Sequence, residues 1–364
     1  MNILMAILMA FLPVASSFFR AAHFGRNRGL PSFQSTAIFS SSSPSQSPSS
    51  SSSSSSSSAT IGYNRNNIDD QLLSCMSTNK QIKVTTCTTR NLLNDLQLIH
   101  ETTTQTADAL GQATASALLL SSGIQEEQIV QLNFKCNGPI RNIMAIADGK
   151  GGVRGYCGNP AASLPTTSEV VGFGGVVQVV KNHPEWKNPY NGITEMRTGE
   201  IDRDVGAYLA ESEQRACALA ASVAGDGMLC RAAGGYTVEQ LPGADEETIS
   251  IIERNLKKIF DENAGNAHRV PASLLLAGKT PLDLAEMILE GLGCEVLETK
   301  IPKIICDCSE ERLVKAMRLL PRDDVDDILK QQEKVEAKCE FCGKVYRITP
   351  EEMIKRLESN SSEQ

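Results

Sequence analysis

The chain lacks the short motifs of nucleotide-driven and hydrolytic enzymes. Its 364 residues contain no Gly-X4-Gly-Lys-Ser/Thr phosphate loop, no Gly-X-Ser-X-Gly elbow and no His-Glu-X-X-His helix. The glycine-rich residues 149–152 and 172–175 fit neither a phosphate loop nor a dinucleotide fingerprint, so we expect turns there. The four histidines show no metal-ligand spacing with one another or with an acid. We therefore predict that the protein is not an enzyme.

A basic surface is missing as well. Lys and Arg number 35 against 43 Asp and Glu, which gives a formal net charge of −8 and a pI of about 5.3. Nucleic acids and anionic membranes are bound through clusters of Lys and Arg. We therefore expect no nucleic acid partner, and no stable membrane association once the N-terminal segment has been removed.

Acidic residues are absent from Arg20 to Asn67, a stretch rich in Arg and Ser that has the composition of an organelle transit peptide. Residues 1–14 before it are apolar and uncharged, which suits the core of a signal peptide but is short for a membrane span. Together they resemble the bipartite presequence of algae with secondary plastids. We predict that residues 1–63 form a presequence and unstructured serine tract that directs the protein to the plastid stroma. A mitochondrial address and an N-terminal membrane anchor are the alternatives.

Four of the eleven cysteines form two close pairs, Cys306 with Cys308 and Cys339 with Cys342. Such pairs favour a structural tetrahedral zinc site, which prefers four thiolates and leaves no position for a substrate. Zinc holds its ligands deprotonated, the form that reacts with peroxide or hypochlorite. We predict one Zn²⁺ per reduced chain; two disulfides or four unrelated thiols are the alternative. The scattered cysteines are predicted to be small buried apolar residues: Cys75, Cys87, Cys136, Cys157, Cys217, Cys230 and Cys294.

The region that follows the presequence mixes strand and helix patterns without a regular β-α-β alternation, which favours an α+β domain. Residues 82–89 and 127–136 are predicted strands, and further strands are expected at 176–180 and from Gly234. Helices are predicted over residues 91–100, 104–122 and 202–212. A further helical pattern over residues 249–259 is amphipathic, and Thr280 and Pro281 should begin another helix that ends at Gly291 or Gly293. These two helices need a surface to cover their apolar sides, and the α+β domain is the obvious one.

The cysteine region comes last and has few apolar residues between positions 309 and 348. A unit this small usually needs a metal to hold it together. Ser309, Asp323 and Thr349 are predicted to cap three helices, the first of which should end near Pro321.

The C-terminal region contains Cys306-Asp-Cys308-Ser309, then Leu-Pro-Arg-Asp-Asp-Val, then Cys339-Glu-Phe-Cys342-Gly343. With these residues the sequence resembles the heat shock protein thirty-three family. Four other matching stretches lie in order: Val153-Arg154-Gly155-Tyr156, Gly199-Glu200-Ile201, Tyr208-Leu209-Ala210-Glu211-Ser212-Glu213-Gln214, and Ala233-Gly234-Gly235-Tyr236 leading to Gln240-Leu241-Pro242-Gly243-Ala244. The resemblance covers residues from about 69 to the C-terminus. Only the N-terminal extension departs from it, and this departure bears on the cellular compartment of the protein and not on its activity.

The resemblance implies an ATP-independent holding chaperone that binds unfolding client proteins and is activated by oxidation. It implies an α+β core over residues 64–242 that forms a homodimer when active, a helical linker over 243–299 and a zinc switch over 300–364. On oxidation Cys339 would pair with Cys342, and Cys306 with Cys308. Zinc would then leave and the linker would unfold from the core.

Two other functions are the alternatives. A zinc-ribbon module that binds nucleic acid is disfavoured by Asp323, Asp324, Asp326 and Asp327 between the cysteine pairs. A dithiol oxidoreductase using Cys339 and Cys342 would require a thioredoxin-like β-α-β context, which the sequence does not show.

Overall fold

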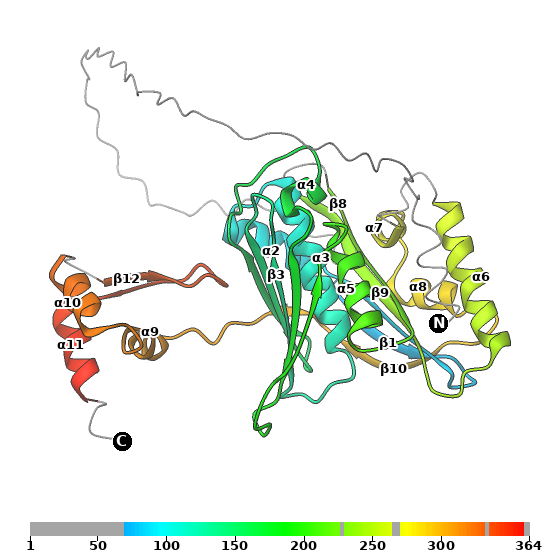
Figure 1. Ribbon diagram of the computed structural model, residues 1–364. Helices are drawn as coiled ribbons and strands as arrows, with labels where there is room; N and C mark the ends of the chain where they lie inside the picture. Colours follow the sequence, from blue (N-terminus) through cyan, green and yellow to red (C-terminus); the bar gives the residue numbers. More distant parts are fainter. Residues whose placement is uncertain (1–68, 226–228, 264–269, 332–334, 360–364) are drawn as a thin grey trace, which may run out of the picture. The chain divides into compact units, whose positions relative to one another are not determined.

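The computed structural model describes residues 69–225, 229–263, 270–331 and 335–359 (Figure 1). The predicted presequence, residues 1–63, lies outside these ranges. The fold is α+β, as predicted, and is built on two sheets and a separate hairpin. Within the described ranges no helix combines the length and apolar character needed to cross a membrane.

The first sheet has five strands in the order β10-β1-β2-β9-β8, and all neighbours are antiparallel. β9 is its longest strand and pairs along much of its length with both β2 and β8. The strands are β1 (Leu72–Met76), β2 (Ile82–Thr88), β8 (Cys217–Gly225), β9 (Cys230–Gln240) and β10 (Glu295–Lys300).

The second sheet has six strands in the order β11-β5-β4-β3-β6-β7. All pairs are antiparallel except β11 with β5, which run parallel. The strands are β3 (Ile129–Lys135), β4 (Asn142–Asp148), β5 (Gly152–Cys157), β6 (Val176–Asn182), β7 (Tyr190–Glu195) and β11 (Lys303–Ile304).

Helix α3 lies at the centre of the core and contacts strands of both sheets. Its Ala-rich sequence leaves little side-chain bulk, and nearly every residue from Thr106 to Ser121 is buried. Such a helix is buried all round rather than amphipathic. The core helices are α2 (Arg90–His100), α3 (Thr104–Ser121), α4 (Thr167–Val171) and α5 (Ile201–Glu211).

Three helices cover one face of the first sheet: α6 (Glu246–Glu262), α7 (Val270–Leu276) and α8 (Pro281–Ile288) (Figure 1). Their apolar side chains share a cluster with Val84 and Val238 of the sheet. Polar contacts fix the position: Thr86 Oγ1 donates to the Pro281 carbonyl (2.9 Å), and the Ala272 amide donates to Ser222 Oγ (2.9 Å). The predicted docking of these helices on the α+β domain is therefore seen.

The C-terminal region contains α9 (Glu310–Met317), α10 (Arg322–Gln331), the hairpin of β12 (Val335–Lys338) and β13 (Val345–Ile348), and α11 (Pro350–Ser359). A small apolar cluster holds them together, with Val314, Val335, Ile348 and Met353 at its centre. Ser309 caps α9 and Thr349 caps α11 as predicted: Ser309 Oγ accepts from the Arg312 amide, and Thr349 Oγ1 from the Glu352 amide, both at 3.3 Å.

Three expectations about elements were wrong. The last residues of the predicted helical linker form strand β10, which pairs with β1. Asp323 does not cap α10 but lies inside its first turn; the Pro321 carbonyl accepts the Val325 amide there, at 3.1 Å. Strand β9 begins at Cys230, so Gly234 and Gly235 lie in its middle, where a Cβ atom would collide with backbone oxygens of β2 and β8.

Candidate metal centre

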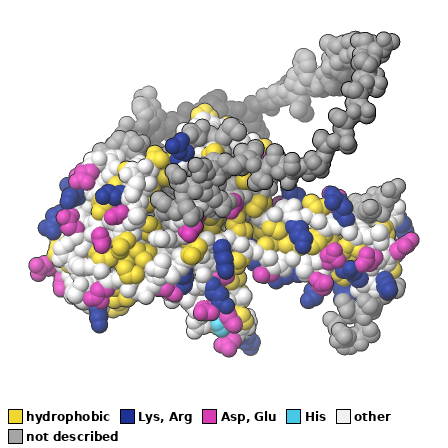
Figure 2. All heavy atoms as spheres, turned by 180° about the vertical axis from the view of Figure 1, so that it is seen from behind, with side chains coloured by type: hydrophobic (Ala, Val, Ile, Leu, Met, Phe, Trp, Pro, Cys, Tyr) yellow, Lys and Arg dark blue, Asp and Glu magenta, His cyan; other side chains and the backbone are white. Residues whose placement is uncertain are grey.

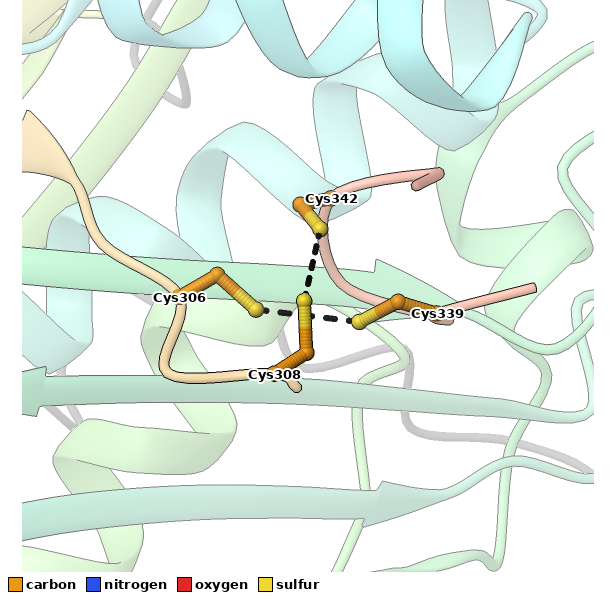
Figure 3. Close-up of side chains that lie close together, drawn as sticks. All are labelled: Cys306, Cys308, Cys339 and Cys342. Atoms are coloured by element: carbon orange, nitrogen blue, oxygen red, sulfur yellow. Dashed lines mark hydrogen bonds between the residues drawn. The ribbon is translucent and has the colours of Figure 1, made fainter. Parts of the chain in front are cut away.

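The two cysteine pairs come from different elements of the C-terminal region. Cys306 and Cys308 lie in the short segment between β11 and α9, while Cys339 and Cys342 lie in the turn of the β12–β13 hairpin. Figure 3 shows the four side chains pointing toward one another. The hairpin turn is closed by two backbone hydrogen bonds, from Cys339 N to Lys344 O (2.8 Å) and from Gly343 N to Cys339 O (2.9 Å).

The four sulfurs have the spacing of a tetrahedral metal site. All four Sγ atoms lie within 4.8 Å of one another, and each side chain is half-buried. Two contacts join the two pairs: Cys306 Sγ to Cys339 Sγ at 3.6 Å and Cys308 Sγ to Cys342 Sγ at 3.4 Å. A tetrahedron with zinc–sulfur bonds of about 2.3 Å has sulfur–sulfur edges of about 3.8 Å. The four residues predicted from the sequence are therefore brought together, and their thiols suit zinc.

Tyr346 on β13 contacts this centre. Its hydroxyl lies 2.8 Å from the Cys308 carbonyl oxygen and 3.0 Å from Cys308 Sγ, and can donate to either. The hydrogen bond from Tyr346 lowers the pKa of the Cys308 thiol to about 7, while burial raises the pKa of Cys306 to about 12. Hydrogen bonds of this kind orient a ligand and support its charged form. Tyr346 could not be identified from the sequence, because its place next to Cys308 depends on the β12–β13 pairing.

The residues between the cysteines contact the core. Asp307 Oδ2 lies 3.3 Å from Arg154 Nη1. The ring of Phe341 meets the ring of Tyr156 edge-on, with centroids 5.1 Å apart, and the Arg154 guanidinium carbon lies 5.1 Å from the Phe341 centroid. Each cysteine pair thus carries one side chain that reaches β5. Arg154 and Tyr156 lie within a stretch that supported the family resemblance, but their contacts with the centre were not predicted.

Backbone pairing continues this contact. The Lys303 amide donates to the Gly151 carbonyl (3.1 Å) and the Ile305 amide donates to the Val153 carbonyl (3.0 Å), so β11 extends the second sheet to the residue before Cys306. The side chain of Ile305 packs over Gly152. The segment that carries the first cysteine pair is therefore fixed to the core on its N-terminal side.

The glycine-rich residues 149–152 form a turn, as predicted, between β4 and β5. Asp148 Oδ1 accepts hydrogen bonds from the amides of Lys150 and Gly152, both at 2.8 Å. The Lys150 ammonium lies 3.3 Å from Glu126 Oε2. A phosphate loop uses such amides and such a lysine to bind its ligand. Here Asp148 accepts from the amides and Glu126 contacts the lysine.

The seven other cysteines only partly follow the prediction that they are buried. Four are fully buried: Cys75, Cys87, Cys157 and Cys230. Cys136, Cys217 and Cys294 are half-buried. Within the described ranges, no second group of three or more His, Cys, Asp or Glu side chains is placed to hold a metal.

The surface gives no sign of a polyanion site on the face drawn in Figure 2, where Lys and Arg are interspersed with Asp and Glu.

Several large apolar side chains are exposed on or next to β10, including Val296 (51 %), Leu297 (52 %) and Ile301 (63 %).

The fold and the centre together define a protein with an α+β core and an appended module that presents four thiols to a metal. Comparison with known proteins gives the family. The family described as Hsp33 protein matches residues 70–349. The 33 kDa chaperonin of Clostridioides difficile is 32 % identical over 296 residues, covering 79 % of this chain and 98 % of that protein. The chain belongs to the Hsp33 family.

Other relatives agree with this assignment. The 33 kDa chaperonin of a Thermoanaerobacter species is 35 % identical over 268 residues, covering 71 % of this chain and 87 % of that protein. The crystal structure of the 33 kDa chaperonin (heat shock protein 33 homolog) of Thermotoga maritima matches with a TM-score of 0.72 at 26 % identity, covering 81 % of this chain and all of that one. These relatives are named as chaperonins and not as enzymes.

Proposed function

We propose that this protein is an ATP-independent holding chaperone, activated when oxidation dismantles a zinc–thiolate centre. The observation that carries the proposal is the convergence of Cys306, Cys308, Cys339 and Cys342 on one point, in a chain that belongs to the Hsp33 family. The proposed ligand is one Zn²⁺ per reduced chain. Its clients would be unfolding proteins, as the chaperonin names of the relatives suggest.

The role of each residue follows from its position. Zinc, when bound, would keep the four sulfurs as thiolates and join the segment before α9 to the β12–β13 hairpin. Oxidation would pair Cys339 with Cys342 and Cys306 with Cys308, and disulfide sulfurs are no longer thiolate ligands. We expect the Cys339–Cys342 bond first, because Cys-X2-Cys spacing closes with less distortion than Cys-X-Cys spacing.

The contacts with β5 provide a route from the centre to the core. Asp307 and Phe341 each lie between two ligand cysteines, so a change in the cysteine geometry displaces both side chains from Arg154 and Tyr156. The segment β10–β11 runs directly from the docked helices to Cys306. Loss of the module would therefore loosen the C-terminal end of the linker.

The linker helices cover the surface that clients would use. Their buried side chains include Ile252, Ile259, Leu274 and Leu284, which lie against the first sheet in one apolar cluster. Release of the helices would expose both sides of this cluster. Exposed apolar surface is what a holding chaperone offers to an unfolding chain.

Two further features of the proposal concern assembly and location. We propose a homodimer in the active state and import into the plastid stroma through the presequence, residues 1–63. The Arg- and Ser-rich, acid-poor composition between Arg20 and Asn67 supports the import. A fluorescent fusion of residues 1–68 should enter the plastid; a cytosolic signal would contradict this part of the proposal.

The central test compares reduced and oxidised protein in one assay. We expect the reduced protein to contain one zinc per chain and to leave a heat-denatured client unprotected. Treatment with peroxide under mild heat should release the zinc and suppress aggregation of the client in the absence of ATP. Equal protection by both forms would remove the redox switch. The absence of protection by either form would contradict the chaperone itself.

A further inference from the structure

A second pair of cysteines lies together, away from the metal centre. Cys75 is on β1 and is fully buried, while Cys294 directly precedes β10 and is half-buried. Each thiol affects the pKa of the other. Both belong to the apolar cluster between the first sheet and the linker helices. Two thiols from distant parts of the sequence thus lie in one cluster where the linker contacts the core.

The backbone holds the two cysteines in this position. β1 and β10 are antiparallel, with Cys75 opposite Val296 and Met76 opposite Glu295, and the register shifts at Ser74 and Cys75. Beyond β1, the Thr78 amide donates to the Leu292 carbonyl at 3.0 Å. These contacts restrain the chain on both sides of Cys294. The register places Cys294 two residues from the partner of Cys75, so the two cysteines are diagonal neighbours across the β1–β10 pair. A disulfide requires close Cα atoms and converging side chains, so the segment before β10 has to move toward β1 for the bond to close.

We propose that Cys75 and Cys294 are a second oxidisable thiol pair, which closes to a disulfide joining β10 to β1 when a peroxide attacks the protein. The site is separate from the four-cysteine centre and requires no metal.

The chemistry proceeds in two balanced steps. The Cys294 thiolate, on the more accessible side, attacks one peroxide oxygen; the O–O bond breaks, one water leaves after protonation, and a sulfenic acid forms. The Cys75 sulfur then attacks the sulfenic sulfur; the S–O bond breaks, a second water leaves, and the S–S bond forms. Two thiols and one hydrogen peroxide thus become one disulfide and two waters, with the sulfurs oxidised and the peroxide oxygens reduced.

The surroundings make this pair slow to react. Burial raises the pKa of Cys75 to about 12 and also raises the pKa of Cys294, and Glu286 on α8 acts in the same direction on both. Peroxide reacts with thiolates, which are scarce at neutral pH when the pKa is high. The bond should therefore form under prolonged or strong oxidation.

The consequence for the linker rests on the proposed function. Cys294 lies at the C-terminal end of the predicted linker, between α8 and β10. A bond to Cys75 keeps that end attached to the first sheet even after the metal module has lost its structure. The pair would therefore limit how far the linker separates from the core.

The test starts from the fully reduced full-length chain. The chain is treated with hydrogen peroxide and then digested with a protease in the absence of reductant. Mass spectrometry should find a linked peptide pair containing Cys75 and Cys294, which disappears on reduction. Cys294→Ser should abolish the pair. Cys217→Ser should retain it: Cys217 is also half-buried, but its raised pKa reflects burial, Glu239 and Glu213 rather than a thiol neighbour. A variant with Ser at positions 306, 308, 339 and 342 should also retain the link, since the pair needs no metal.

The proposal is overturned if Cys294 is oxidised while Cys75 remains a thiol, or if the link forms only in urea-unfolded chain. Hydrogen exchange then tests the consequence. After oxidation, the β10 amides should exchange several-fold faster in Cys294→Ser than in the unsubstituted chain. Equal exchange rates would overturn the restraint on the linker but not the chaperone proposal, which the aggregation assay tests separately.

Discussion

The core and the C-terminal module of this protein are stabilised in different ways. In the core, a large apolar cluster extends from α3 through the strands of the second sheet and includes Phe134, Ile143 and Tyr208, each 0–1 % exposed. Among the described side chains of the module, the apolar cluster has six buried residues, two of which, Met317 and Val325, retain 6 % and 9 % exposure. A cluster of that size rarely stabilises a fold by itself. From this difference we expect that the core can fold without a metal, whereas the module needs its four thiols to hold one.

The largest expected effect comes from removing the metal ligands, which tests this comparison directly. With Ser at positions 306, 308, 339 and 342, the module should lose its structure while the core keeps its own. Structural zinc contributes about 10–16 kcal/mol of apparent binding free energy, more than a small cluster can replace. Zinc analysis should find no bound metal, and hydrogen exchange should show fast amides in α9–α11 and protected amides in α3. Stoichiometric zinc in this variant would refute the ligand assignment.

A smaller effect is expected at the contact between module and core. Phe341→Ala removes the ring that meets Tyr156 and Arg154. For a half-buried aromatic side chain we expect a loss of about 2 kcal/mol in docking. Hydrogen exchange at β11 and β5 should accelerate in the reduced state, and zinc should leave at lower peroxide. Leu319→Ala is the matched control, since Leu319 is 86 % exposed. Unchanged exchange in Phe341→Ala would show that the ring does not couple the two regions.

Within the module, Tyr346→Phe should weaken metal binding without unfolding the hairpin. The change removes only the hydroxyl that contacts the Cys308 sulfur and carbonyl oxygen. Loss of a hydrogen bond to a metal ligand typically lowers affinity by about 10-fold or more. Competition with a chromophoric chelator should measure the difference. Tyr190→Phe, at an exposed position on β7, should bind zinc as the unsubstituted chain does.

How much of the structure could be predicted differs between local and long-range features. The helices α2, α3 and α5 follow from local patterns, and the Thr280 cap is confirmed by its reciprocal hydrogen bonds with Asp283. Strand β10 was missed because its partner β1 lies more than two hundred residues earlier, and its short, exposed sequence carries little pattern of its own. Asp323 was misplaced because α10 already begins at Arg322, directly after Pro321, and an acid in the first turn also suits the helix dipole.

The same distinction applies to the metal centre. The four cysteines could be chosen from spacing alone, because closely spaced pairs are typical of structural zinc sites. Tyr346, Asp307 and Phe341 gain their roles from the β12–β13 pairing and from the contact with β5, which no local pattern encodes. Phe341 was visible in the sequence only as an apolar residue between two ligands.

The smallest expected effect lies in the core alone. It is a pH dependence of folding stability that comes from a core residue and not from the module. Burial raises the pKa of Asp202, at the start of α5, to about 7, although its carboxylate accepts hydrogen bonds from the Ala221 and Arg203 amides. The folded chain therefore binds more protons here than the unfolded chain between pH about 4 and 7, so stability falls as pH rises through that range. Asp202→Asn removes this loss.

We expect Asp202→Asn to be more stable than the unsubstituted chain at pH 8, by on the order of 1 kcal/mol, because partial exposure screens the charge. The difference should vanish near pH 4, where both side chains are neutral, and urea unfolding at several pH values measures it. Asp283→Asn should behave in the opposite way: hydrogen bonds from Thr280 lower the pKa of Asp283, so its contribution is present at neutral pH and is lost as pH falls. A pH-independent difference for Asp202→Asn would mean that the pKa of Asp202 is the same in the folded and unfolded chains.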